Sequence, residues 1–167
     1  PLTTKGFLEK LTRLGAKKAI LLTDKVFQGA DTLATAYALS LAVKKINPDL
    51  IICGRQTLEG DTGQVGPMLA VKAGYSLITN VTEISANETD IICKTRSGGV
   101  ESAVYPALIT VERINTLRLP SIRSKSCEVE IWTAEDIGAD IKKCGLTGSP
   151  TRVLKTYENE SGKRKCK

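Results

Sequence analysis

The strongest constraint on the fold is the apolar run Leu50-Ile51-Ile52-Cys53, which is followed directly by the polar, glycine-rich stretch 54–65. A short continuous apolar run is typical of a strand buried in a parallel sheet. A helical pattern starts where the polar stretch ends, and the first turn of that helix would present free N–H groups and the positive end of the helix dipole. A strand, a loop and a helix in this order predict an anion site.

Two interpretations of this stretch stay open on the residues alone. Thr62 offers a hydroxyl donor, Gln64 an amide, and Asp61 or Glu59 a carboxylate suited to ribose hydroxyls. An Asp or a Thr in front of a helix is also a common N-cap that needs no ligand. The pattern is therefore compatible with a phosphate site and with simple helix capping.

Helical and extended patterns alternate along the rest of the chain. Helical spacing predicts one helix that ends at Gly15, one that begins at the N-cap Asp31, and one that ends at Gly74. Extended patterns predict strands over 19–23, 50–53, 76–84, 106–111 and 128–132, and a hairpin of 91–94 with 101–104 around Gly98-Gly99. Thr133 is expected to cap a further helix.

This order of elements predicts an α/β fold: a Rossmann-like, open and mainly parallel sheet with helices on both faces, plus a β-hairpin and a C-terminal arm. Residues 1–145 would form the α/β domain, and residues 146–167 an extended arm with a basic tail. The loops 23–25 and 54–65 should be neighbours at the carboxyl edge of the sheet, where open α/β sheets bind ligands. Because the chain starts with a helix and then a strand, we expect an earlier part of the domain to be missing.

Composition excludes several classes of function. The chain has no histidine, which excludes a Ser-His-Asp triad, Cys-His catalysis and histidine-based metal sites. Its net charge is +6, but no aromatic residue lies within a basic cluster, so docking to an acidic protein is expected rather than nucleic-acid binding. No apolar run approaches the ~20 residues that cross a bilayer. The five cysteines form no CxxC pair, which favours a cytoplasmic protein with reduced thiols and no membrane insertion.

Three motifs carry a resemblance to a known family: GRQTLEGDTGQVGP at 54–67, DTLATAYAL at 31–39 and GLTGSPTRV at 145–153. Together they resemble the β subunits of electron transfer flavoproteins, in the branch with the Fix and bifurcating types, whose fold is of the adenine-nucleotide α-hydrolase kind. The resemblance implies FAD, or alternatively AMP, as the ligand, with FAD favoured by the likeness to bifurcating members. It places the nucleotide phosphates on Gly54, Arg55, Gln56, Thr57, Leu58, Glu59, Gly60, Asp61, Thr62, Gly63, Gln64 and Val65.

The same resemblance implies partners and a role. The chain would pair with a FAD-carrying α subunit, onto which the C-terminal arm reaches, and would pass electrons between dehydrogenases and downstream acceptors. It would be an electron carrier subunit and not an enzyme, since the flavin performs the redox chemistry. An acyl-CoA or related dehydrogenase would dock on segment 115–125, through Asn115, Arg118, the apolar anchor Ile122 and Arg123, although the lysine-rich stretch that usually follows the anchor is shortened here.

Family members are considerably longer on the N-terminal side, where they supply the first strands and several adenine contacts. We therefore expect this chain alone to bind nucleotide poorly. The alternative is an ATP-binding enzyme or a stress-type protein of the same fold, with Glu59 and Asp61 as metal-binding acids. That alternative is disfavoured because the loop has neither the GxxxxGK[ST] nor the SGGxD pattern.

Overall fold

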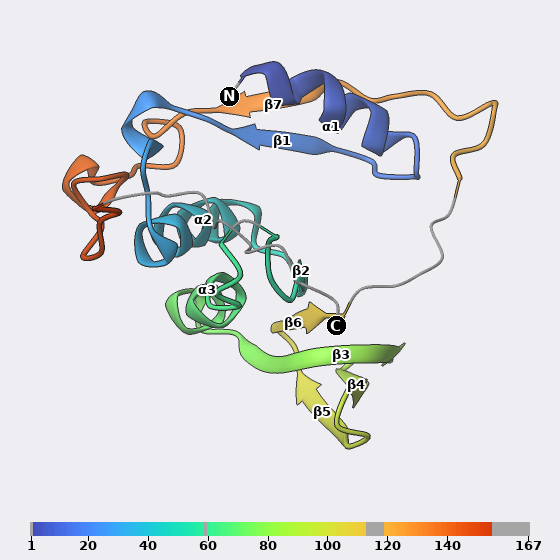
Figure 1. The fold of residues 1–167 in the computed structure, drawn as a ribbon. Coiled ribbons are helices and arrows are strands. Elements are labelled where there is room, and N and C mark those ends of the chain that lie inside the picture. The colour runs from blue at the N-terminus through green and yellow to red at the C-terminus, as the bar shows by residue number, and fades with distance from the viewer. Residues whose placement is uncertain (1, 59, 113–118, 155–167) are drawn as a thin grey trace, which may run out of the picture.

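The computed structural model describes residues 2–58, 60–112 and 119–154. It is an α/β protein with open, mostly parallel sheets flanked by helices, as predicted (Figure 1). The helices are α1 (Lys5–Thr12), α2 (Thr32–Ile46) and α3 (Val65–Ala73), and short 3-10 turns occur at Leu2–Thr4, Lys25–Phe27 and Ile141–Lys143. The strands are β1 (Ala19–Leu22), β2 (Leu50–Gly54), β3 (Ser76–Ala86), β4 (Asp90–Thr95), β5 (Val100–Val104), β6 (Ala107–Val111) and β7 (Val129–Trp132).

The larger sheet has the strand order β2-β6-β3-β4-β5. Its first three strands are parallel, with Leu108 of β6 opposite both Ile51 and Leu77. β4 and β5 form the predicted antiparallel hairpin, and its turn uses a positive φ of 87° at Gly98. The crossover from β2 through α3 to β3 leaves the space between these two strands to β6, which returns to the sheet much later in the chain.

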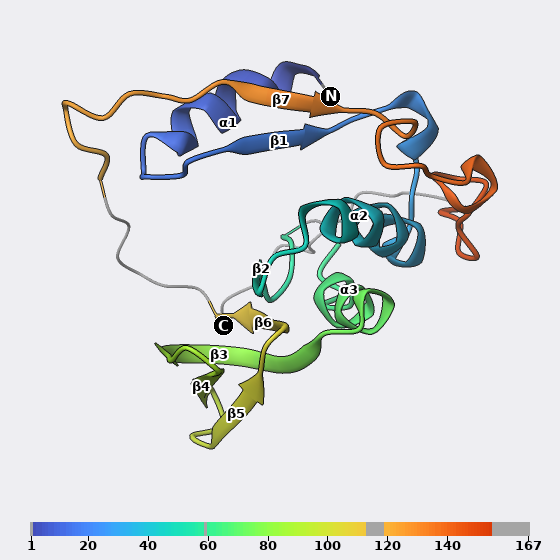
Figure 2. The same cartoon turned by 180° about the vertical axis from the view of Figure 1, so that it is seen from behind.

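The smaller sheet consists of β1 and β7, which pair in parallel with Leu21 opposite Ile131. Figures 1 and 2 show α1 on this pair and α2 between the two sheets. α2 bridges them by contacts with the segment after β7: Lys45 donates to the carbonyl of Asp136 at 2.7 Å, and the Tyr37 hydroxyl accepts from the amide of Asp140 at 3.0 Å. The single predicted sheet is thus divided in two within the described residues.

Alternation along β6 divides the core of the larger sheet into two layers. Leu108 faces α3 and packs with Leu69 and Ala70, and Leu39 of α2 completes this layer. Ala107 and Ile109 point to the opposite face and pack on the hairpin, in a cluster of Ile78, Val81, Ile91, Cys93, Ala107 and Ile109. Because both faces of β6 are buried, this strand reads as a continuous apolar run, as expected of a central parallel strand.

The predicted caps of α2 and α3 are confirmed, whereas α1 ends at Thr12, before the predicted stop at Gly15, and one predicted helix is replaced by a single turn. Asp31 caps α2 by accepting from the amides of Leu33 and Ala34 at 3.0 Å, and α3 ends at Gly74 with φ 78°. Thr133 and Asp136 do exchange capping hydrogen bonds. No helix follows them, because Gly138, with φ 62°, ends the segment after a single turn.

The start of the predicted arm is fastened to the beginning of α2. Ser149 is buried and accepts from the amide of Asp31 at 2.8 Å, and the Asp31 carboxylate accepts from both the amide and the hydroxyl of Thr151. Burial of this carboxylate opposes ionisation, but the hydrogen bonds from Ala34, Thr151 and Leu33 outweigh it and lower the pKa of Asp31. One charged side chain therefore caps a helix and holds residues 149–151.

The cysteines of the described residues form no disulfide with one another. Cys53, Cys93, Cys127 and Cys144 are free thiols, and burial raises the pKa of Cys53, Cys93 and Cys144. None of the described helices is long and apolar enough to cross a membrane.

Candidate nucleotide site

The predicted loop lies where β2 ends at the carboxyl edge of the larger sheet and leads into α3. Its first residue after the strand, Arg55, continues the sheet ladder, because its amide donates to the carbonyl of Val111 at 3.0 Å. The rest of the loop is mostly exposed, and Leu58 at its tip is 96% exposed. Glu59 lies outside the described residues. The loop is therefore anchored at its base and open along its length.

Short-range hydrogen bonds fold the loop back on itself. Thr57 accepts from the amides of Gly60 and Asp61, through its hydroxyl and its carbonyl, at 3.2 and 3.1 Å. The side-chain amide of Gln56 donates to the carboxylate of Asp61. Asp61 and Gly63 have φ values of 48° and 63°, which an Asp tolerates and a Gly adopts without strain. These turns carry the chain from the end of β2 back to the start of α3.

The only capping-type contact before α3 among the described residues is that of the Thr62 hydroxyl, which accepts from the amide of Gln64 at 3.5 Å. Gln64 is the N-cap of α3, and its side chain makes no capping hydrogen bond. The side-chain oxygen of Gln64, Oε1, accepts instead from the hydroxyl of Thr32 at the start of α2, at 3.2 Å. The third residue of α3 is Pro67, which has no N–H, so the donors left at this helix end are the amides of Val65 and Gly66. The helix end thus presents two amides and the Thr62 hydroxyl, a donor set that fits a phosphate.

A close approach of α3 to β6 determines where these amides lie. A Cβ at Gly66 would come within 2.7 Å of the Cγ2 of Thr110 and 3.8 Å of Leu108. Only glycine lets the first turn of α3 pack so near to the sheet. Gly66 belongs to the motif 54–67, but its packing role was not predicted from the sequence.

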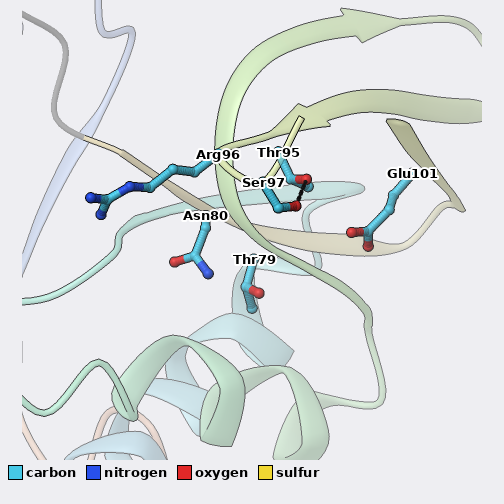
Figure 3. A pocket seen from close by; sticks show the side chains of 6 residues that line it. All are labelled: Thr79, Asn80, Thr95, Arg96, Ser97 and Glu101. Atoms are coloured by element: carbon cyan, nitrogen blue, oxygen red, sulfur yellow. Dashed lines mark hydrogen bonds between the residues drawn. The ribbon is translucent and has the colours of Figure 1, made fainter. Parts of the chain in front are cut away.

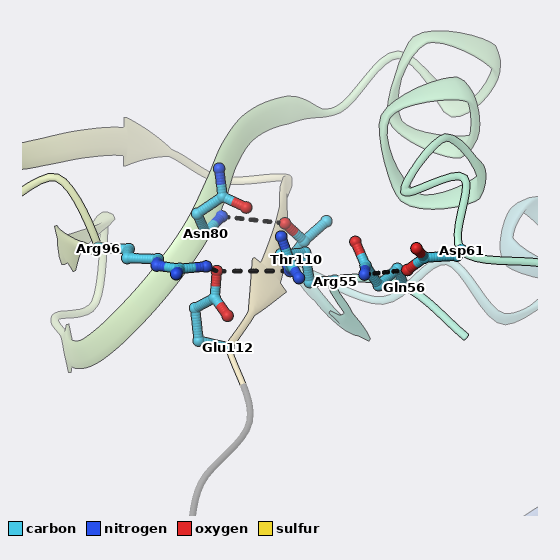
Figure 4. A network of polar contacts seen from close by, with 7 residues as sticks. All are labelled: Arg55, Gln56, Asp61, Asn80, Arg96, Thr110 and Glu112. Atoms are coloured by element: carbon cyan, nitrogen blue, oxygen red, sulfur yellow. Dashed lines mark hydrogen bonds and ion pairs between the residues drawn. The ribbon is translucent and has the colours of Figure 1, made fainter. Parts of the chain in front are cut away.

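A charge cluster at the same edge was not predicted from the sequence. The carboxylate of Glu112, at the end of β6, forms ion pairs with Arg55 at 3.5 Å and with Arg96 of the hairpin at 3.6 Å (Figure 4). The Glu112 side chain is 18% exposed and that of Arg96 67%. No local pattern signals this cluster, because its three residues come from three different strand ends.

Asn80 brings the hairpin to this edge. It lies at an irregularity in the pairing of β3 with β6, and its φ of 57° turns its peptide groups out of the ladder. Its amide donates to the hydroxyl of Thr110 at 3.1 Å, and its carbonyl accepts from the amide of Arg96 at 2.8 Å. The bulge therefore fixes the turn of the hairpin next to the end of β6.

A polar cavity of about 470 Å³ lies at the turn of the hairpin, lined by Thr79, Asn80, Thr95, Arg96, Ser97 and Glu101 (Figure 3). The side chain of Arg96 extends away from that of Glu101 in this view, toward the end of β6. The hydroxyls of Thr95 and Ser97 are hydrogen-bonded to each other at 2.9 Å. Because Arg96 points out of the cavity, its charge belongs to the Glu112 cluster.

Residues 23–25 were predicted to lie beside loop 54–65, but they follow a strand of the smaller sheet. Residues 23–25 lie at the end of β1, in the other sheet, where Asp24 accepts from the amides of Val26 and Ala134. The element that meets loop 54–65 from that side is the start of α2, through Thr32. Of the predicted docking residues, Asn115 and Arg118 lie outside the described residues, whereas Ile122 is 97% exposed and Arg123 is exposed beside it.

The fold and the loop define a class: an α/β protein with an exposed loop and an uncapped helix start at the carboxyl edge of parallel strands. Comparison with known proteins agrees, since residues 3–137 match the electron transfer flavoprotein domain. The chain belongs to the electron transfer flavoprotein family. Protein FixA of Azorhizobium caulinodans is 41% identical, over 94% of this chain and 62% of the relative. The electron transfer flavoprotein subunit beta of Clostridium acetobutylicum is 38% identical, over 96% and 65%. The chain spans less than two thirds of the length of either relative.

Proposed function

We propose that the chain is the nucleotide-binding part of an electron transfer flavoprotein β subunit, and that it binds FAD, or alternatively AMP, on residues 54–65. The single observation that carries this is the start of α3, whose amides no side chain caps among the described residues and whose neighbours are Thr62 and Gln64. The family match supports the assignment to β subunits.

Each part of the loop has a role in this proposal. The amides of Val65 and Gly66, with the hydroxyl of Thr62 and the amide of Gln64, would hold phosphate oxygens. Asp61, held by Gln56, would face a ribose hydroxyl. The bound flavin would supply the redox chemistry, so that the residues of this chain bind and orient it.

The proposed partners follow from the family as well. The β subunit would pair with a FAD-carrying α subunit in the cytoplasm and exchange electrons with an acyl-CoA or related dehydrogenase. Segment 115–125, including Asn115, Arg118, Ile122 and Arg123, would form the docking surface. Within this segment the exposed side chains of Leu119, Ile122 and Arg123 suit a partner surface with an apolar pocket and an acidic rim. The competing proposal, an ATP-hydrolysing enzyme, would require turnover of ATP.

The test is calorimetric titration of FAD and of AMP into nucleotide-free full-length protein. Thr62→Ala combined with Gln64→Ala should weaken binding at least about a hundredfold, because two hydrogen bonds to a charged phosphate are lost and each contributes about 1.5–3 kcal/mol. Thr82→Ala is the matched control, since it also removes an exposed hydroxyl, one that bonds the carbonyl of Lys94 on the hairpin. Unchanged affinity in the double variant would refute the phosphate site.

A further inference from the structure

Backbone hydrogen bonds fix all three members of the Arg55, Glu112 and Arg96 cluster. The amide of Arg55 donates to Val111, and the amide of Glu112 donates to Val81 at 2.9 Å, so both residues extend sheet ladders. The amide of Arg96 is held by Asn80. Three rigid strand ends therefore present their side chains to one another, and the meeting point does not depend on a mobile backbone.

The cluster is unbalanced in charge. Both guanidinium groups approach the same oxygen of Glu112, Oε1, which is buried. One carboxylate cannot neutralise two guanidinium groups, so the cluster keeps a net positive charge. Because Glu112 is largely buried, its charge is costly unless both arginines stay close. The carboxylate thus constrains the position of Arg55, and Arg96 places a second positive charge beside it.

Arg55 in turn determines the course of the nucleotide loop. A Cβ built at Gly63 would lie 3.7 Å from the carbonyl oxygen of Arg55, so the two ends of the loop come close together at this point. The next residue, Gln56, closes the loop by its hydrogen bond to Asp61. A shift of Arg55 would therefore move Gly63 and the start of α3, where the proposed phosphate donors lie.

We infer that Arg96, on the hairpin and outside the loop, is a positioning residue for the nucleotide loop and that it acts through Glu112 and Arg55. This inference rests on the proposed function for its effect on nucleotide affinity. It does not place Arg96 in contact with the nucleotide. The hairpin would then contribute to the binding site although none of its residues belongs to the recognised motif.

The hairpin offers a matched control for this inference. Lys94 lies on β4, two residues before Arg96. It forms an ion pair with Glu83 at 3.0 Å, and both side chains are at least half exposed. Lys94→Gln and Arg96→Gln each remove one charge and one ion pair from the same hairpin, and only Arg96 is connected to the loop. Arg96→Lys keeps the positive charge, so it should behave more like the unmodified protein than Arg96→Gln does.

Two measurements test the inference on full-length protein: the affinity for FAD and AMP, and amide hydrogen exchange at residues 60–64 without nucleotide. Arg96→Gln should speed exchange of these amides and weaken nucleotide binding about two- to thirtyfold, the range of couplings transmitted through packed networks. Glu112→Gln should do the same, and the double variant should be no worse than either single one, since all act through one connection. Lys94→Gln should change neither quantity.

Normal loop exchange in Arg96→Gln, with or without a lower melting temperature, would overturn the inference. The exchange measurement does not depend on a ligand, so it also separates this inference from the proposed function. If neither FAD nor AMP binds the unmodified protein, the proposed function fails while faster loop exchange in Arg96→Gln still supports the connection.

Discussion

Ile122 is the side chain on which the proposed docking of a dehydrogenase depends most. It is 97% exposed, Leu119 nearby is 85% exposed, and Arg123 stands next to it. Ile122→Ala should weaken docking of a dehydrogenase about ten- to a hundredfold, because burying an aliphatic side chain contributes about 1.5–3 kcal/mol. The measurement is the electron-transfer rate at subsaturating partner, over a range of ionic strength. Leu119→Ala is the control, and equal effects of the two variants would contradict an anchor at Ile122.

α3 shows how a single contact between elements sets the geometry of the site. Gly66→Ala would drive a methyl group into Thr110, so it should destabilise the protein by about 1–3 kcal/mol and move the amides that start the helix. Thr110→Ser removes the opposing methyl group and keeps the hydroxyl that Asn80 uses. It should therefore restore much of the lost stability in the double variant. Denaturant unfolding measures both effects, and an absence of rescue would show that another contact causes the loss.

A suitable control for this element is Gly6→Ala in α1, where an added Cβ meets nothing within 4 Å. Alanine favours a helix over glycine by up to about 1 kcal/mol, so this variant should be neutral or stabilised. A large loss in Gly6→Ala would mean that glycine substitutions destabilise this chain for reasons unrelated to the packing of α3.

In the whole molecule, the division into two sheets predicts two levels of stability. The main core clusters lie in the larger sheet, whereas β1 and β7 form a two-stranded pair joined to it through α2. An isolated pair of strands is only marginally stable, so amides of β1 and β7 should exchange faster than those of β6. Leu21→Ala should speed exchange only in β1 and β7, and Ile109→Ala should speed it everywhere. Equal protection in both sheets would indicate a single cooperative unit.

Much of the fold was predictable because its signals are local. The caps at Asp31 and Gly74, the hairpin turn and the apolar run of β2 each depend on a few adjacent residues, whose conformational preferences act wherever the strand or helix is placed. The position of the loop between β2 and α3 was predictable for the same reason, because the apolar run and the helical pattern on either side of it are local signals. The helix expected after Thr133 failed for an equally local reason, the positive φ of Gly138.

Strand order and the Glu112 cluster were not predictable in this way. Nothing in the pattern of β6 says that it enters between β2 and β3, or that β1 pairs with β7 in a separate sheet. Arg55, Arg96 and Glu112 are ordinary exposed-type residues in the sequence, and they become a cluster only when three distant strand ends meet at one edge. Local preferences therefore specify which segments form strands, helices and turns. Which of them become neighbours depends on burying the faces of the whole sheet together, and this is decided only in the folded chain.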